Sequence, residues 1–121
     1  MIMKLDFASS APIYQQIRDQ IVQAVADGDY LDGDRLPTIR ALAGEAGINT
    51  MTVNKAYQLL KQEGYIITDR RNGAIVQCSG GRKKAVEKKV NKELELLAAE
   101  AKIAGISQEE FLEFCRKAYS G

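Results

Sequence analysis

Apolar residues recur every three or four positions in three stretches between Pro12 and Gly64, a spacing that predicts three amphipathic helices. The apolar face of the first consists of Ile13, Ile17, Ile21 and Val25. The second, which Thr38 can cap and Gly47 ends, has an apolar face of Ile39, Leu42, Ala43 and Ala46. The third, capped by Asn49 or Thr50, has an apolar face of Val53, Ala56, Tyr57 and Leu60. Residues 1–11 are expected to be extended or loose, and residues 29–37 to form a loop.

Two short strand-like runs follow the third helix, at residues 65–68 and 74–78. The Asn72-Gly73 pair between them is typical of a hairpin turn. We therefore expect a β-hairpin whose tip carries Arg70 and Arg71.

The composition shifts to Lys, Glu, Ala and Leu after a flexible joint at residues 79–81. A narrow apolar stripe, typical of a helix–helix seam, then consists of Val86, Val90, Leu94, Leu97, Ala101 and Ala104. Gly105 ends this helix, and the Ser107–Glu110 pair is a capping box that opens a last helix. The apolar face of that helix consists of Phe111, Phe114, Cys115 and Ala118.

The length of 121 residues leaves room for one compact domain with a short appendage. No apolar run approaches the roughly 20 residues that a membrane-spanning helix needs. The N-terminus also lacks the apolar segment of a signal peptide, so a cytoplasmic location is expected. In that compartment Cys78 and Cys115, which form no Cys-x-x-Cys pair, are interpreted as reduced thiols, with a redox-sensing pair as the alternative.

The chain contains no histidine, which excludes histidine-dependent triads, histidine-ligated zinc and imidazole acid–base catalysis. Its carboxylates are scattered, and no glycine-rich loop could cradle a phosphate. An enzyme is therefore not expected, and neither is a metal or another cofactor. The net charge of +1 argues against a histone-like, non-specific nucleic-acid binder.

The second and third predicted helices have the spacing of a helix-turn-helix. A small residue at Ala43 lets two helices cross closely, Gly47 can supply a turn with positive φ, and Val53 can fill the space between them. In such a motif the second helix enters the major groove of DNA. Three helices followed by a hairpin predict an α+β fold that is mostly α: a winged helix-turn-helix domain over residues 1–79, then a two-helix dimerisation tail over residues 80–121.

The stretch from Gly28 to Ala43 resembles the N-terminal signature of GntR-family regulators, as does the stretch from Val53 to Gly64. The hairpin ending in residues 72–76 fits the same family. The opening at residues 12–17 and the short helical tail resemble the YtrA-like subfamily. This resemblance implies a sequence-specific transcriptional regulator that binds double-stranded operator DNA as a homodimer.

The resemblance also implies particular DNA contacts. Arg40 matches an arginine at the start of the second helix that contacts DNA. Thr38 matches a neighbouring position that contacts the DNA backbone. Gly73 matches a wing-tip glycine that approaches the minor groove. The N-terminal turn of the recognition helix would supply Asn49, Thr50, Met51, Thr52 and Asn54. Many family members carry arginines where this chain has Thr50 and Asn54, so the operator sequence does not transfer.

The residue types suit these contacts, because arginine can grip guanine or a phosphate and asparagine can read adenine. Arg70 and Arg71 suit a phosphate or a narrow minor groove, and Lys55 and Asn72 complete the candidate set. Other interpretations stay open at this stage. Arg40 could pair with Asp34 or Glu45, the wing arginines could be solvated turn charges, and Asn54 and Lys55 could be ordinary surface residues.

The tail leaves no room for a large effector domain, and its apolar stripe needs a partner. A second copy of the chain is favoured over folding back onto the first domain. The expected dimer interface consists of Val90, Leu94, Leu97, Ala101, Phe111 and Phe114. A two-fold dimer would read half-sites about 10 base pairs apart, or a multiple of that, and repress by occupying a promoter.

An effector, if the protein has one, is expected to be a small molecule near the dimer interface, and the family resemblance suggests genes for a transport system as targets. Two rival interpretations are a winged helix used only for protein contact and a fragment of a larger regulator with an aminotransferase-like domain.

Overall fold

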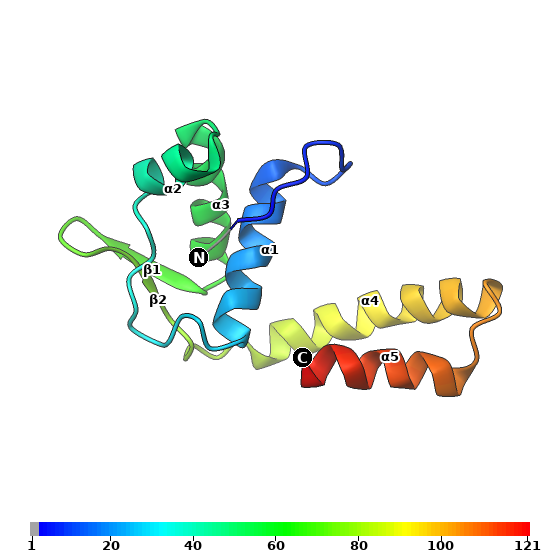
Figure 1. Ribbon diagram of the computed structural model, residues 1–121. Coiled ribbons are helices and arrows are strands. Elements are labelled where there is room, and N and C mark those ends of the chain that lie inside the picture. The colour runs from blue at the N-terminus through cyan, green and yellow to red at the C-terminus, as the bar shows by residue number, and fades with distance from the viewer. Residues whose placement is uncertain (1–2) are drawn as a thin grey trace. The chain divides into compact units, whose positions relative to one another are not determined.

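The computed structural model describes residues 3–121, and within them five helices and one hairpin follow each other along the chain (Figure 1). They are α1 (Ile13–Ala26), α2 (Ile39–Ala46), α3 (Thr50–Gln62), β1 (Ile66–Asp69), β2 (Gly73–Val76), α4 (Lys83–Ile103) and α5 (Gln108–Ser120). The chain divides into two compact units, one ending at Gly80 and the other covering Gly81–Gly121. The predicted fold class, a winged helix-turn-helix followed by two helices, is confirmed.

The core of the first unit lies between α1, α2, α3 and the hairpin, and α1 packs mainly against α3. The apolar faces predicted from the sequence supply this core. Its fully buried side chains are Ile17, Ile21, Leu42, Val53, Leu60, Ile66 and Val76. Each side chain of this kind contributes about 1.5–3 kcal/mol when it leaves water, so the core holds α3 firmly while its outer face stays exposed.

The turn between α2 and α3 is fixed by side-chain caps and one glycine. Thr38 Oγ1 accepts a hydrogen bond from the Ala41 amide at 3.0 Å and starts α2. Gly47 ends α2 in the left-handed conformation, with φ of 68°. Asn49 caps α3, since its Oδ1 accepts a hydrogen bond from the Met51 amide at 2.7 Å. Of the two caps that the sequence allowed for α3, Asn49 is therefore the one used.

The hairpin pairs β1 with β2 in antiparallel register, from Ile66 opposite Val76 to Asp69 opposite Gly73. Residues 70–72 form the tip, and Gly73 follows with a φ of +71°, which favours glycine. The hairpin lies beside α2 and α3 in the arrangement of a wing (Figure 1); we call residues 66–76 the wing.

Part of the predicted loop at residues 29–37 pairs with the wing instead. The Leu36 amide donates to the Ala74 carbonyl at 2.9 Å, and the Val76 amide donates to the Asp34 carbonyl at 2.8 Å. Arg35 and Ile75 form an antiparallel bridge. The sequence did not reveal this pairing because the segment is too short to show a strand pattern and its partner lies about 40 residues away in the chain.

The N-terminal segment is more ordered than its sequence suggested. Two glutamines of α1 bind its backbone as a neighbouring strand would: Gln20 exchanges two hydrogen bonds with Lys4, and Gln16 exchanges two with Asp6, all between 2.7 and 2.9 Å. Of the two expectations for this segment, extended or loose, these hydrogen bonds favour an extended segment held on α1, and residues 1–2 lie outside the described part. Local side-chain hydrogen bonds of this kind leave no periodic signal in the sequence.

The second unit is a pair of helices, α4 and α5, joined by a turn at Gly105 (φ of +80°). The predicted capping box is present: Ser107 Oγ accepts from the Glu110 amide, and the Glu110 carboxylate accepts from the Ser107 amide. Ala101 is the one buried residue among those described in this unit. No helix in the described chain is both long and apolar enough to cross a membrane.

Candidate nucleic-acid interface

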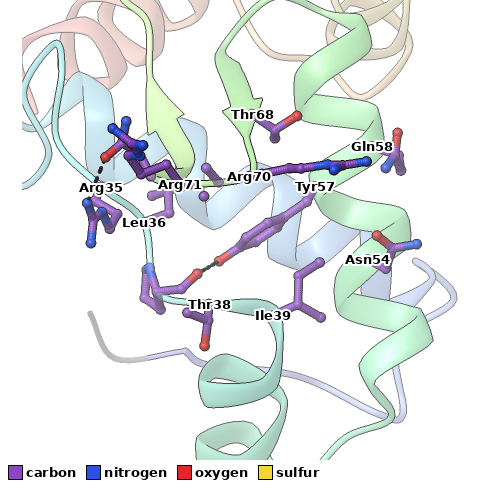
Figure 2. Close-up of a pocket in the computed structure, with 14 residues that line it drawn as sticks. Arg35, Leu36, Thr38, Ile39, Asn54, Tyr57, Gln58, Thr68, Arg70 and Arg71 are labelled. Carbon is purple, nitrogen blue, oxygen red and sulfur yellow. Dashed lines mark hydrogen bonds between the residues drawn. The ribbon is translucent and has the colours of Figure 1, made fainter.

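A groove of about 470 Å³ lies between the start of α2, the outer face of α3 and the wing (Figure 2). It brings together six of the predicted DNA-contacting residues, which are Thr38, Asn54, Arg70, Arg71, Asn72 and Gly73. Three other polar residues line it as well, which are Arg35, Gln58 and Thr68. Segments more than 30 residues apart in the chain thus present polar and cationic groups to one concave surface.

Tyr57 forms the apolar floor of this groove and joins two of its walls. The side chain is 4% exposed, and its hydroxyl donates a hydrogen bond to the Pro37 carbonyl oxygen at 2.7 Å (Figure 2). Burial raises the pKa of Tyr57, so the hydroxyl keeps its proton and remains a donor. This hydrogen bond ties α3 to the segment that leads into Thr38, the cap of α2.

The residues at the N-termini of α2 and α3 are exposed beside the groove. Arg40 is exposed, and no ion pair among residues 3–121 joins it to Asp34 or Glu45. The alternative in which Arg40 is a neutralised surface charge is therefore not seen, and its guanidinium is available. Thr50 and Met51 are exposed too, the latter by 75%, and Thr52 is half-buried.

Asn49 has a smaller capacity for base contacts than its side chain suggests. Its carbonyl oxygen already accepts the capping hydrogen bond from the Met51 amide, so one of the two acceptor positions of that oxygen is in use. A bidentate contact with adenine needs both the oxygen and the NH₂ group of an asparagine. Asn54 lines the groove, and no hydrogen bond within the described part of the chain engages its side chain, so its oxygen and its NH₂ group are both available.

The tip of the wing is held together by Asn72. Its amide and its side-chain NH₂ both donate to the Asp69 carboxylate, while its Oδ1 accepts a hydrogen bond from Arg35 at 3.2 Å. The Asn72 hydrogen bonds, first that of its backbone, hold the pKa of Asp69 below its usual value. With Asn72 engaged on both sides, Arg70 and Arg71 are the exposed cations of the tip, and Arg70 extends from the wing toward α3 (Figure 2).

Lys55 lies elsewhere on α3. Its ammonium sits 4.2 Å from the centre of the Tyr14 ring, a cation–π contact that directs the side chain toward α1. Lys55 does not line the groove, and its contact with DNA stays a prediction.

Three polar residues of the groove, Arg35, Gln58 and Thr68, were not among the predicted DNA contacts. Gln58 follows Asn54 by four positions on the predicted outer face of α3, so the helical period could have revealed it. Arg35 lies in a segment predicted as a loop, and only the pairing of that segment with β2 brings it to the wing. No local pattern in the sequence signals that placement.

Residues 13–76 match the family described as bacterial regulatory proteins, gntR family. The chain belongs to this family. It is similar over nearly its whole length to the HTH-type transcriptional repressor YtrA of Bacillus subtilis (strain 168): 34% identity over 119 residues, covering 96% of this chain and 91% of the relative.

Two solved structures show the same fold. A transcriptional antiterminator from Listeria monocytogenes EGD-e has a TM-score of 0.87 and 28% identity, over 100% of this chain and 91% of that one. YtrA from Sulfolobus acidocaldarius, a GntR-family transcription factor, has a TM-score of 0.65 and 39% identity, over 78% of this chain and 99% of that one. The chain is thus a DNA-binding transcriptional regulator of the GntR family and not an enzyme.

Proposed function

We propose that this GntR-family regulator is a cytoplasmic, dimeric repressor that binds an inverted-repeat operator. Residues 1–79 are assigned to DNA binding and residues 80–121 to dimerisation. The observation that carries the proposal is the groove, where the start of α2, the outer face of α3 and the wing present their polar side chains to one surface. The relative from Bacillus subtilis, YtrA, is a transcriptional repressor, which supports repression over activation for this chain.

The α3 helix is assigned to the major groove of each half-site. The residues that would meet base edges there are the exposed Asn49, Thr50, Met51 and Asn54 and the half-buried Thr52. Asn54 suits adenine, and the methyl groups of Thr50 and Met51 suit the thymine methyl. Thr38 and Arg40 would hold the DNA backbone beside them, and Lys55 would reach a phosphate once released from Tyr14.

The wing is assigned to the adjacent minor groove. Arg70 and Arg71 are exposed at its tip, and arginine favours the strong negative potential of a narrow minor groove. Gly73 carries no side chain next to the tip, so the backbone can approach the sugar-phosphate chain closely.

The tail is assigned to dimerisation because it has too little core of its own. Three of the large apolar side chains of α4 and α5, those of Leu94, Leu97 and Phe114, are 37–53% exposed. The predicted interface residues Leu94, Leu97, Ala101, Phe111 and Phe114 line one open apolar hollow of about 580 Å³, and Val90 lies one turn away on α4. A two-fold dimer would present two recognition helices to half-sites about one helical turn of DNA apart, or a multiple of it.

The test is fluorescence anisotropy on the promoter upstream of this protein's own gene, beside scrambled DNA, at several salt concentrations. Wild type is compared with Arg40→Ala and with the control Arg116→Ala. The control removes the same charge from α5, where Arg116 is 68% exposed at its side chain and pairs with Glu113. The proposal expects sequence-selective binding that Arg40→Ala loses by about tenfold or more and that Arg116→Ala retains.

Equal, weak binding of wild type to both DNAs calls for selection from random sequences, since the operator can lie elsewhere. If selection enriches no sequence, the operator-binding proposal is wrong, and a winged helix used for protein contact becomes the better explanation.

A further inference from the structure

Three residues from two distant parts of the chain form a continuous hydrogen-bonded series at the base of the wing tip. Arg35 Nη2 donates to Asn72 Oδ1 at 3.2 Å, and Asn72 Nδ2 donates to Asp69 Oδ2 at 3.1 Å. The Asn72 backbone amide makes a second hydrogen bond to the same carboxylate. The carboxamide of Asn72 thus stands between a cation and an anion.

This arrangement leaves Arg35 without a direct ion-pair partner. Among the described residues no ion pair joins Arg35 to Asp69: the carboxylate takes its hydrogen bonds from Asn72, and the Arg35 charge acts on it only through space, as the smallest of the causes that lower the pKa of Asp69. A guanidinium carries several N–H donors in a planar fork, and the bond to Asn72 uses one of them. The remaining donors of Arg35 stay available to an oxyanion.

The backbone of Arg35 is also fixed. The residue bridges to Ile75 of β2, and the neighbouring Leu36 amide donates to the Ala74 carbonyl at 2.9 Å. Its exposed side chain lines the same groove as Thr38 and the two wing arginines (Figure 2). A cation held by a strand-like backbone and by a side-chain hydrogen bond loses little freedom on binding, which favours a positioned phosphate contact.

We propose that Arg35 is a further DNA-contacting residue, which binds a backbone phosphate between α2 and the wing, and that Asn72 acts as its positioning residue. This inference rests on the proposed function, since it adds a contact to the same DNA surface. The rival explanation is that Arg35 only fastens the wing and touches no DNA.

The variant Arg35→Gln separates the two explanations, because glutamine can still donate a hydrogen bond to Asn72 but carries no charge. A phosphate contact predicts that the slope of log K against log salt falls by about one in this variant. Arg35→Gln should lower the slope by the same amount in a protein in which Arg70 and Arg71 are both replaced by alanine. That result is expected if Arg35 contacts DNA independently of the wing arginines. Arg35→Lys, which keeps the charge, should retain most of the slope.

The role of Asn72 is tested by Asn72→Ala alone and together with Arg35→Gln. If Asn72 acts by positioning Arg35, Asn72→Ala alone should bind DNA more weakly than wild type. The double variant should then bind no more weakly than Arg35→Gln alone. Thermal unfolding of each variant confirms that the first unit remains folded.

The proposal is overturned if Arg35→Gln binds with the salt slope of wild type. It is also overturned if the effect of Arg35→Gln disappears in the background that lacks Arg70 and Arg71, because Arg35 would then act only through the wing. A wild-type protein that selects no DNA sequence contradicts the proposed function as a whole. Loss of binding in Arg40→Ala together with an unchanged Arg35→Gln contradicts this inference alone.

Discussion

The hydroxyl of Tyr57 lies 2.7 Å from the carbonyl oxygen of Pro37, which immediately precedes the cap of α2. Tyr57 lies on the buried face of α3, one turn beyond Val53, so one hydrogen bond links the recognition helix to the start of its neighbour. Because Pro37 has no amide hydrogen, its carbonyl is the only backbone hydrogen-bonding group that it offers. This link, together with the packing of α2 on α3, helps to fix the relative position of Arg40 and Asn54.

Tyr57→Phe should lower the free energy of unfolding by about 1 kcal/mol, because the Pro37 carbonyl loses its donor in a largely buried place. Thermal or urea unfolding measures the change. The control is Tyr119→Phe, whose ring is 96% exposed, so its unfolding should match that of wild type. Equal stability of both variants would show that the Tyr57 hydrogen bond contributes nothing.

Glu63→Gln should destabilise the first unit more strongly than Tyr57→Phe does. Arg18 is 7% exposed and donates to both Glu63 carboxylate oxygens at 2.9 Å, and its guanidinium lies 5.5 Å from the centre of the Tyr65 ring. Hydrogen bonding to Glu63 raises the pKa of Arg18. A guanidinium is protonated at neutral pH even without such a partner, so Arg18 stays charged when Glu63 is neutralised. A buried charge without its counter-ion costs about 3 kcal/mol, less here because Glu63 is partly exposed and Asp19 remains.

Urea unfolding at neutral pH checks this, with Glu113→Gln as the control. Glu113 pairs with Arg116 on the exposed surface of α5, where an ion pair contributes about 0–1 kcal/mol. If Glu63→Gln and Glu113→Gln lower the free energy of unfolding by the same small amount, the Arg18–Glu63 pair stabilises the protein no more than a surface ion pair does.

The sequence predicted the elements well where local signals exist and failed where distant segments meet. Helical periodicity and the caps at Thr38, Asn49 and Ser107 were enough to place all five helices. The pairing of Arg35 with the wing depends on backbone hydrogen bonds across some 40 residues, and such contacts leave no local pattern.

The same limit applies to the candidate site. Residue types alone indicated Asn72 as a DNA contact, whereas its hydrogen bonds to Asp69 and Arg35 occupy both ends of its carboxamide. The cation–π contact of Lys55 with Tyr14 likewise joins two helices that sequence reasoning treated separately. Side-chain partners of this kind follow from packing, which no periodicity reports.

Gly44 inside α2 and Gly47 just after it should change stability in opposite directions when replaced by alanine. Gly47 has a φ of +68°, where alanine is strained by about 1 kcal/mol, whereas Gly44 lies inside α2 and has open space where a Cβ would be. Gly44→Ala should therefore raise the free energy of unfolding by about 0.5–1 kcal/mol, and the melting temperature with it. Gly47→Ala should lower the melting temperature. A stabilised Gly47→Ala would contradict the assigned turn between α2 and α3.

Leu97→Asp should convert the dimer into monomers. Leu97 lines the apolar hollow between α4 and α5, and the proposed interface would bury the new carboxylate against Phe111 and Phe114. An uncompensated buried charge costs about 3 kcal/mol or more, so the dimer dissociation constant should rise by at least about a hundredfold. Sedimentation velocity at micromolar concentration measures the change.

The matched control is Leu96→Asp, which introduces the same charge one position earlier on α4. Leu96 is 65% exposed, does not line the hollow, and lies about 100° around the helix from Leu97. It should leave the dimer intact and keep selective DNA binding. A wild-type protein that sediments as a monomer, or two variants that dissociate equally, would contradict the assignment of this face to dimerisation. Loss of operator affinity in Leu97→Asp alone would connect the tail to DNA binding, because a monomer contacts only one half-site at a time.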